Sequence, residues 1–264
     1  MAGTGGCGRW LVTGASRGIG RAIALELARR GAATTLVARD AAALAGVAAE
    51  VEALGGSAVT RPTDLSDPLD RAALLAELAS APPFEGLVNN AGAGLHGAFA
   101  SADPAAQVRL LELDVLAPVL LARAVLPAMA AAGRGHLVTM ASVAAWAPTP
   151  DEALYGAAKA ALASLDGALR VELRRAGVSV TTVAPGLTRT EFFDRAGFDP
   201  AAHELGGLVW STPEEVARAA VAGALRGRRR VVPGGRNRIL GVLLRHLPLG
   251  FPRFVGRRLM KARR

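Results

Sequence analysis

Residues 9–28 read Arg-Trp-Leu-Val-Thr-Gly-Ala-Ser-Arg-Gly-Ile-Gly-Arg-Ala-Ile-Ala-Leu-Glu-Leu-Ala, and this stretch decides the fold. A short apolar segment predicts a strand, which runs into a turn holding Gly14, Gly18 and Gly20, and an amphipathic helix follows. Glycines in such a turn let the backbone approach a pyrophosphate, while the helix N-terminus supplies N–H groups and positive dipole. The spacing is GxxxGxG rather than the commoner GxGxxG. The stretch predicts a dinucleotide site at the first strand-to-helix junction.

The second predicted strand, 34–38, indicates which dinucleotide binds. It ends at Arg39-Asp40, and in a dinucleotide fold this strand end meets the adenosine ribose. An acidic residue there would bind the free 2′-hydroxyl of NAD, whereas Arg17 and Arg39 converging on one phosphate favour NADP(H). Asp40 is the contrary signal, but it lies one residue further on and can cap the next helix. We therefore expect NADP(H), with NAD(H) as the alternative.

The rest of the chain alternates apolar strands with Ala- and Leu-rich helical segments, including helices at 41–54 and 119–132. This alternation predicts an α/β fold with a doubly wound parallel sheet of about seven strands in a single domain. Its 264 residues suit one such domain, which we place at 1–235, with a C-terminal extension at 236–264. The predicted strands are 11–13, 34–38, 57–60, 86–89, 136–140, 178–183 and 230–232.

The formal net charge of +9 arises entirely from the C-terminal part of the chain. Residues 216–264 hold 14 of the 31 Lys and Arg and no acidic residue, whereas the first 215 residues are net negative. The extension mixes apolar residues with arginines and is too short and too charged to span a bilayer. Three interpretations stay open: packing against a sister subunit or over a substrate cleft, peripheral contact with an anionic membrane, and nucleic-acid binding, which no recognition motif accompanies.

Cysteine and histidine usage bounds the remaining chemistry. The single Cys7 excludes an internal disulfide, and one Cys with four His forms no cluster at metal-ligand spacing, so we expect no metal. No signal peptide precedes the first predicted strand, and we therefore expect a cytoplasmic protein, with association with a membrane through its C-terminus as an open alternative.

A candidate catalytic triplet lies in the second half of the chain. Tyr155 and Lys159 are four residues apart, so they share one face of a helix, and Ser142 comes from a preceding strand end. A free tyrosine hydroxyl, with a pKa of about 10, is a poor acid or base at neutral pH. An ammonium one turn away is expected to lower that pKa, and the serine hydroxyl can hold a carbonyl oxygen beside the phenol.

Taken together and in this order, these motifs resemble the short-chain dehydrogenase/reductase family over residues 9–232. The segment from Thr13 to Gly20 resembles its cofactor loop, Asn89-Asn-Ala-Gly92 its NNAG turn, and Ser142, Tyr155 and Lys159 its catalytic residues. The resemblance implies a Rossmann-like fold, a homodimer or homotetramer, and the following cofactor-binding residues: Gly14, Ser16, Arg17, Gly18, Ile19, Gly20, Arg39, Asp64, Leu65, Asn90, Ala91, Gly92, Tyr155, Lys159, Pro185, Gly186 and Thr188.

One position departs from the family pattern. The family's fourth catalytic residue is an Asn that breaks a helix locally, so that a backbone carbonyl binds a water in a proton relay with the lysine. Aligning 113–118 with that pattern places Asp114 at this position. An ionised Asp cannot donate a hydrogen bond, and it adds negative charge near Lys159. We therefore expect a working enzyme with an altered pH profile.

The resemblance implies reversible hydride transfer between NADP(H) and a ketone/secondary alcohol pair, with Tyr155 as general acid and base. The segments after Ser142 and after Gly186 are expected to wall the substrate pocket, and their Trp146, Phe192 and Phe193 favour a small hydrophobic carbonyl or alcohol. Two alternatives stay open: a cofactor-binding or scaffold protein that has lost catalysis, and an NAD-linked alcohol dehydrogenase.

Overall fold

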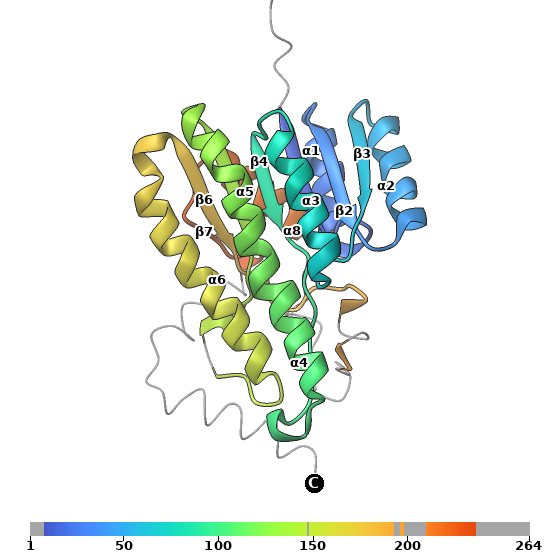
Figure 1. The fold of residues 1–264 in the computed structure, drawn as a ribbon, viewed down its shortest axis with the longest axis vertical. Coiled ribbons are helices and arrows are strands. Elements are labelled where there is room, and N and C mark those ends of the chain that lie inside the picture. Colours follow the sequence, from blue (N-terminus) through green and yellow to red (C-terminus); the bar gives the residue numbers. More distant parts are fainter. Residues whose placement is uncertain (1–7, 147, 193–195, 198–209, 236–264) are drawn as a thin grey trace, which may run out of the picture.

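The computed structural model describes residues 8–146, 148–192, 196–197 and 210–235 (Figure 1). Seven parallel strands form one sheet in the order β3-β2-β1-β4-β5-β6-β7, which confirms the predicted fold class. Every predicted strand is present, and the largest differences at an end are two residues. For example, β3 continues to Pro62 because its pairing with β2 extends to Ala38. The strands are β1 (Arg9–Thr13), β2 (Ala33–Ala38), β3 (Ser57–Pro62), β4 (Gly86–Asn89), β5 (Gly135–Met140), β6 (Val178–Val183) and β7 (Arg230–Val231).

Helices cover both faces of this sheet (Figure 1). On one face lie α1 (Gly18–Ala28), α2 (Ala41–Ala53) and α8 (Pro213–Leu225). On the other lie α3 (Pro68–Ser80), α5 (Ala117–Ala131) and α6 (Ala153–Glu172), and α4 (Pro104–Leu111) leads into α5. Because successive strand residues point to opposite faces, Trp10 and Val12 enter the first core while Leu11 enters the second. Burial on both faces explains why these strands are continuously apolar.

The chain reverses direction across the sheet between β1 and β4. It moves outward from β1 to β3 and then returns to β4, which pairs with the opposite side of β1. The connections that leave β1 and β4 therefore diverge, and ligands of open α/β sheets bind in the crevice that opens at the carboxyl ends of such strands. The fold brings the predicted glycine loop, the NNAG turn and the catalytic serine to this one edge.

Side-chain caps define where several helices begin. Asp40 accepts a hydrogen bond from the backbone N–H of Ala43 at 3.0 Å, which confirms its predicted role as the cap of α2. Thr212 and Glu215 form a reciprocal capping box at the start of α8. Asp40, the acidic residue after β2, is therefore already bound to the N-terminus of α2.

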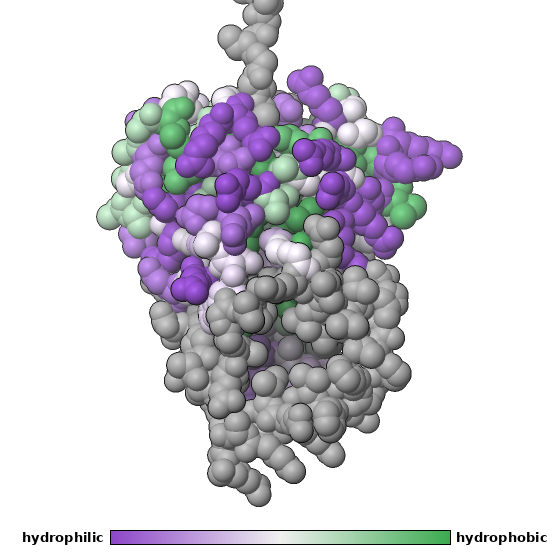
Figure 2. Space-filling model, turned by 180° about the vertical axis from the view of Figure 1, so that it is seen from behind, coloured by the Kyte–Doolittle hydropathy of each residue, from purple (hydrophilic) through white to green (hydrophobic). Residues whose placement is uncertain are grey.

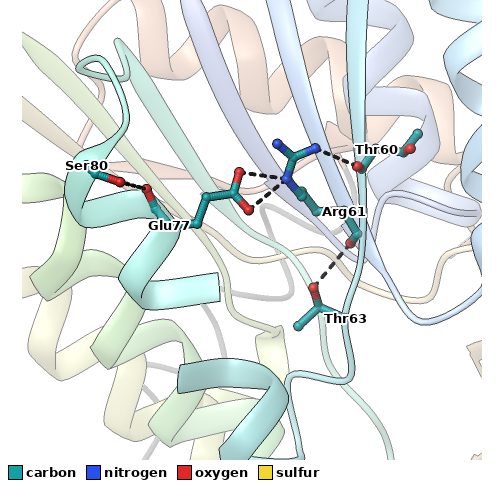
Figure 3. Close-up of polar contacts among 5 residues, drawn as sticks. All are labelled: Thr60, Arg61, Thr63, Glu77 and Ser80. Carbon is teal, nitrogen blue, oxygen red and sulfur yellow. Dashed lines mark hydrogen bonds and ion pairs between the residues drawn. The ribbon is translucent and has the colours of Figure 1, made fainter. Parts of the chain in front are cut away.

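The exposed edge strand β3 is tied to α3 through one ion pair (Figure 3). Arg61 Nε donates to both carboxylate oxygens of Glu77, at 2.6 and 2.8 Å. The Oγ1 of Thr63 donates to the carbonyl of Arg61, where the chain leaves β3 for the loop that follows. The pair is half-exposed, so its contribution is to orient the strand end rather than to add much stability.

Some of the sequence predictions concern residues outside the part of the chain that the structure describes. Phe193, Cys7 and the extension 236–264 lie outside the described residues. Within the described part, the helical run from Pro104 to Ala131 is long and apolar enough to cross a membrane by length and composition alone. Its α5 portion packs against the sheet through Leu121, Val125 and Met129, as the core helix of a globular domain does.

A buried carboxyl group joins α6 to the sheet. Asp166 accepts hydrogen bonds from Thr139 Oγ1 of β5 at 2.9 Å and from Thr182 Oγ1 of β6 at 2.7 Å. Burial raises the pKa of Asp166 to about 6, and the two hydroxyls only partly offset this effect. The folded chain therefore holds this proton more tightly than the unfolded chain, so the stability that Asp166 contributes at low pH is lost as the pH rises through about 6.

We predict that Asp166→Asn stabilises the protein above about pH 7 by up to about 3 kcal/mol. The amide is uncharged at every pH, and both threonine hydroxyls can accept as well as donate hydrogen bonds. Urea unfolding of both proteins at several pH values measures the difference in unfolding free energy. The advantage of the variant should shrink toward about pH 4, and a difference independent of pH would contradict the assignment.

Candidate active site

The glycine loop between β1 and α1 is built for close backbone approach. Gly14 and Gly18 have φ values of +64° and +52°, in the left-handed region that favours glycine. A Cβ on Gly20 would lie 2.1 Å from the carbonyl oxygen of Gly14, so no larger residue fits. Side chains at these positions would fill the loop, so the glycines leave an open cradle. A pyrophosphate site at a helix N-terminus requires such a cradle.

The end of β4 is tied to this loop by the side chain of Thr13. Its Oγ1 accepts hydrogen bonds from the backbone N–H of Asn90 at 2.9 Å and of Ala91 at 3.0 Å. Asn90 Nδ2 donates in return to the carbonyls of Thr13 and Gly14, at 2.9 and 3.3 Å. Asn89 Nδ2 donates to the carbonyl of Pro118, which joins β4 to α5. The predicted NNAG turn thus supports both the cofactor loop and the neighbouring helix.

The predicted phosphate-binding arginines are each held by carboxylates. Arg17 Nη1 lies 2.8 Å from Glu191 Oε2, and its Nη2 lies 3.5 Å from Asp40 Oδ2. Arg39 Nη1 lies 3.9 Å from Asp64 Oδ2. Glu191 was not predicted from the sequence, because nothing in its segment shows that the chain returns to the glycine loop. The structure shows this return directly, since a Cβ on Gly18 would contact Thr190 Cγ2 at 3.2 Å.

A buried arginine joins the segment of the predicted cofactor residue Leu65 to the turn that carries Asp114. Arg71 donates to the carbonyl of Leu65 at 2.8 Å, and its Nη2 lies 2.7 Å from Glu112 Oε2. Leu65 is one of the predicted cofactor residues, and Glu112 is in the turn that carries Asp114. In the sequence, Arg71 is one more charged residue of an amphipathic helix, and no local signal distinguishes it from a solvated one.

The catalytic triplet converges at the carboxyl end of β5. Ser142 follows this strand, and α6 carries Tyr155 and Lys159 one helical turn apart. Lys159 Nζ lies 5.5 Å from the centre of the Tyr155 ring, and the Ser142 hydroxyl is close enough to the phenol to affect its pKa. The three side chains therefore lie together, as their spacing predicts, with Lys159 buried and Ser142 and Tyr155 half-buried.

Asp114 joins this group by pairing directly with the lysine. Its Oδ2 lies 2.9 Å from Lys159 Nζ, and its Oδ1 accepts a hydrogen bond from the backbone N–H of Ala93 at 2.7 Å. The helix is locally widened here into a π-helical turn, Glu112–Leu116, between α4 and α5. Such turns are frequent at functional sites. A Cβ on Gly92 would lie 3.0 Å from both Asp114 Oδ2 and Lys159 Nζ, so this glycine leaves room for the pair.

The electrostatics of the site correct one expectation. Burial raises the pKa of Tyr155 above its ordinary value; Lys159 and the Ser142 hydroxyl oppose this effect, and the carboxylates of Asp114 and Glu152 add to it. Lys159 lowers the pKa of Tyr155, as predicted, but the opposite effect of burial is larger, so the pKa is not brought below its ordinary value. Burial also raises the pKa of Asp114, although the charge of Lys159 opposes this effect. For Lys159, burial acts to lower the pKa, but Asp114 and Tyr155 together raise it.

The walls of the predicted substrate pocket are only partly as expected. The Phe192 ring lies 5.6 Å from that of Tyr155 and therefore covers the phenol. Trp146 instead stacks with the guanidinium of Arg230, at 4.6 Å, beside the edge strand β7. Gly94 contacts the opposite segment closely, because its Cβ would lie 2.5 Å from that of Ala196. Sequence analysis did not predict Gly94 and Ala196 as part of this wall, because neither residue has a functional group in its side chain.

The remaining predicted residues lie along the same edge. The carbonyl of Pro185 accepts from the N–H of Val143, and Thr188 is buried where its segment pairs with Ser211. Gly186 accepts a hydrogen bond from the Thr188 hydroxyl. Ser16 lies in the glycine loop, whereas the Ile19 side chain packs against the core, so only its backbone faces the cradle. Among the described residues, no three His, Cys, Asp or Glu side chains gather as metal ligands would.

Comparison with known proteins identifies the family. The family model "short chain dehydrogenase" matches residues 9–199. A ketoacyl reductase, HetN of Nostoc sp., is 34% identical over 216 residues, which are 80% of this chain and 73% of that protein.

Two solved structures resemble the whole chain. A short-chain dehydrogenase from Sphingobium yanoikuyae in complex with NADPH has a TM-score of 0.80 and 33% identity, covering 97% of this chain and 96% of that one. The bulky-bulky ketone specific alcohol dehydrogenase from Comamonas testosteroni has a TM-score of 0.77 and 30% identity, with coverage of 97% and 94%. The protein is therefore a member of the short-chain dehydrogenase family of oxidoreductases.

Proposed function

We propose that this oxidoreductase uses NADP(H) to interconvert a hydrophobic ketone and its secondary alcohol, with Tyr155 as the general acid and base. The observation that carries the proposal is the proximity of Ser142, Tyr155 and the buried Lys159 at the carboxyl end of β5. This edge also holds the glycine cradle, so a dinucleotide there would end beside the phenol.

The residues present fit a dinucleotide with a 2′-phosphate. The cradle of Gly14, Gly18 and Gly20 suits the pyrophosphate, and Arg17 and Arg39 suit the 2′-phosphate. Asp40 is engaged by the N-terminus of α2 and by Arg17, which reduces its repulsion of that phosphate. When bound, NADP(H) supplies or accepts the hydride. The NADPH complex of the Sphingobium relative supports this choice of cofactor.

The proton is handled by the chain's own side chains. In reduction, the Tyr155 hydroxyl donates its proton to the carbonyl oxygen as negative charge develops there. The Ser142 hydroxyl holds the same oxygen and polarises it. Lys159 stabilises the phenolate that remains and supplies the nearest cation in the pocket. In oxidation, the same groups act in reverse, with the phenolate accepting the proton of the alcohol.

The surroundings of the phenol favour an apolar substrate. Phe192 covers Tyr155, and its ring also lies against the small residue Gly94. An aromatic side chain at the reacting centre stabilises a substrate with an apolar group next to its carbonyl. The specificity of the Comamonas relative for bulky ketones supports the same substrate class.

We further propose that a second copy of the chain covers the face formed by α4, α5 and α6. In Figure 1, α6 lies beside the continuous helical run of α4 and α5, and these helices expose Val108, Leu111, Leu116 and Val171 by 58%, 40%, 39% and 76%. By contrast, hydrophilic residues dominate the coloured surface of the opposite face in Figure 2. Exposed apolar side chains gathered on adjacent helices are typical of a subunit interface.

We predict that Tyr155→Phe lowers turnover of a hydrophobic ketone by at least about 100-fold, because the variant lacks the proton donor. The ring and its contact with Phe192 are retained, so the NADPH dissociation constant should stay nearly unchanged. Steady-state oxidation of NADPH and a fluorescence titration of NADPH measure the two quantities. Normal turnover in the variant would refute the assignment, and a wild-type protein that binds NADPH but reduces no ketone of a broad panel would favour the scaffold alternative.

We predict that Arg17→Ala weakens NADPH binding by about 10- to 100-fold, the range of charge-assisted hydrogen bonds, and NADH binding much less. Fluorescence titrations with both nucleotides measure the two dissociation constants. Arg21→Ala is the matched control, because Arg21 is in the first turn of α1, four residues after Arg17, and pairs with Glu50 of α2. It should leave the ratio of the two constants unchanged. An equal loss for NADPH and NADH in Arg17→Ala would contradict the assignment of the 2′-phosphate site.

A further inference from the structure

The buried pairing of Asp114 with Lys159 has a consequence for the acid–base group of the site. Asp114 is fully buried and Lys159 is 4% exposed, and their charged atoms lie 2.9 Å apart. Water therefore screens neither group from the other, nor from the nearby phenol. A buried charge is tolerated only when it is paired, and here each group is the other's partner.

The charge balance of this pair does not depend on which atom holds the proton. With an ammonium and a carboxylate the pair is neutral, and with an amine and a carboxylic acid it is neutral as well. An uncharged side chain at position 114, as in the family pattern, would leave Lys159 with a net charge of +1 at the same distance from Tyr155. Asp114 thus cancels the positive charge that would otherwise stabilise the phenolate.

The other charged groups around the phenol do not restore this charge. Glu152, at the start of α6, acts on Tyr155 in the same direction as Asp114. On the π-helical turn itself, Glu112 pairs with Arg71 and makes a second neutral pair. The Ser142 hydroxyl and the Phe192 ring, which also lie beside the phenol, carry no charge.

We propose that Asp114 is a positioning residue that keeps Tyr155 protonated at neutral and mildly alkaline pH, so that the site works as a proton donor and favours carbonyl reduction under these conditions. The inference rests on the proposed function. In the reduction, hydride from NADPH forms the new C–H bond while the carbonyl π pair moves to oxygen and takes the Tyr155 proton, leaving alcohol, NADP⁺ and a phenolate. A proton from solvent then restores the phenol. Oxidation needs the phenolate at the outset, so it should require high pH.

The composition of the chain allows a direct test, because Tyr155 is its only tyrosine. The phenolate absorbs in the near ultraviolet where phenol does not, so a pH titration of this absorbance reports Tyr155 alone, without substrate or cofactor. Circular dichroism at each pH identifies the range in which the chain stays folded. Tyr155→Phe supplies the baseline, because it should show no such titration.

We predict that Asp114→Asn lowers the midpoint of this titration by about one pH unit or more, the usual effect of one nearby charge. Asn can still accept the hydrogen bond from Ala93, so the variant retains the anchor of the turn. Glu112→Gln is the matched control, because it removes a carboxylate from the same turn that pairs with Arg71 instead of facing the phenol. Its midpoint should equal that of the wild type.

An equal midpoint in the wild type and Asp114→Asn, both folded, would overturn the inference. If the wild-type phenol ionises only together with alkaline unfolding, a folded Asp114→Asn protein that ionises at lower pH supports it. For the active enzyme, the rise of alcohol oxidation with pH and the alkaline decline of ketone reduction should both move to lower pH in Asp114→Asn. Failure of the proposed function would be seen separately, as an absence of turnover, because the phenol titration does not depend on enzymatic activity.

Discussion

The buried ion pair between Asp114 and Lys159 is the interaction on which the arrangement of the site depends. Two charges without water must lie next to each other, so the π-helical turn and α6 have to meet across the NNAG turn. Gly92 is required at that crossing, because any side chain there would press on both charged atoms. The N–H of Ala93 completes the contact and joins the pair to the end of β4. A single interaction thus sets the distance between the strand that supports the cofactor loop and the helix that carries the phenol.

The topology of the sheet explains why these groups meet at all. Residues 13, 90, 142 and 185 are far apart in the chain, yet each follows a strand of one parallel sheet. Parallel strands bring their carboxyl ends to one edge, and the reversal between β1 and β4 opens that edge to a ligand. Asp166 holds α6 against β5 and β6 through two threonine hydroxyls. When the pH is above its raised pKa, the buried carboxylate lowers the stability of the fold. The helix α6 is therefore positioned by polar contacts of Lys159 and Asp166, which lie two turns apart on one of its faces.

Sequence analysis predicts the parts of this protein that rest on local pattern. The strands follow from apolar runs, the cap of α2 from Asp40, and the glycine loop from its position between a strand and a helix. The convergence of Ser142, Tyr155 and Lys159 follows from a helical spacing together with the family resemblance. Side-chain direction could not be predicted in the same way. Trp146, expected in the substrate pocket, turns to Arg230, whereas Glu191, which carried no signal, reaches Arg17 across the cofactor loop.

The sequence by itself determined the fold and the family, because periodicity and motif spacing are properties of neighbouring positions in the chain. Only the tertiary structure decided how strongly the residues of the site are buried and which charges face one another. Desolvation depends on everything packed around a group, and this is why burial raises the pKa of Tyr155 although Lys159 lies one turn away. For the same reason, Asp114 is a one-letter departure in the sequence but a partner for the catalytic lysine in the folded protein.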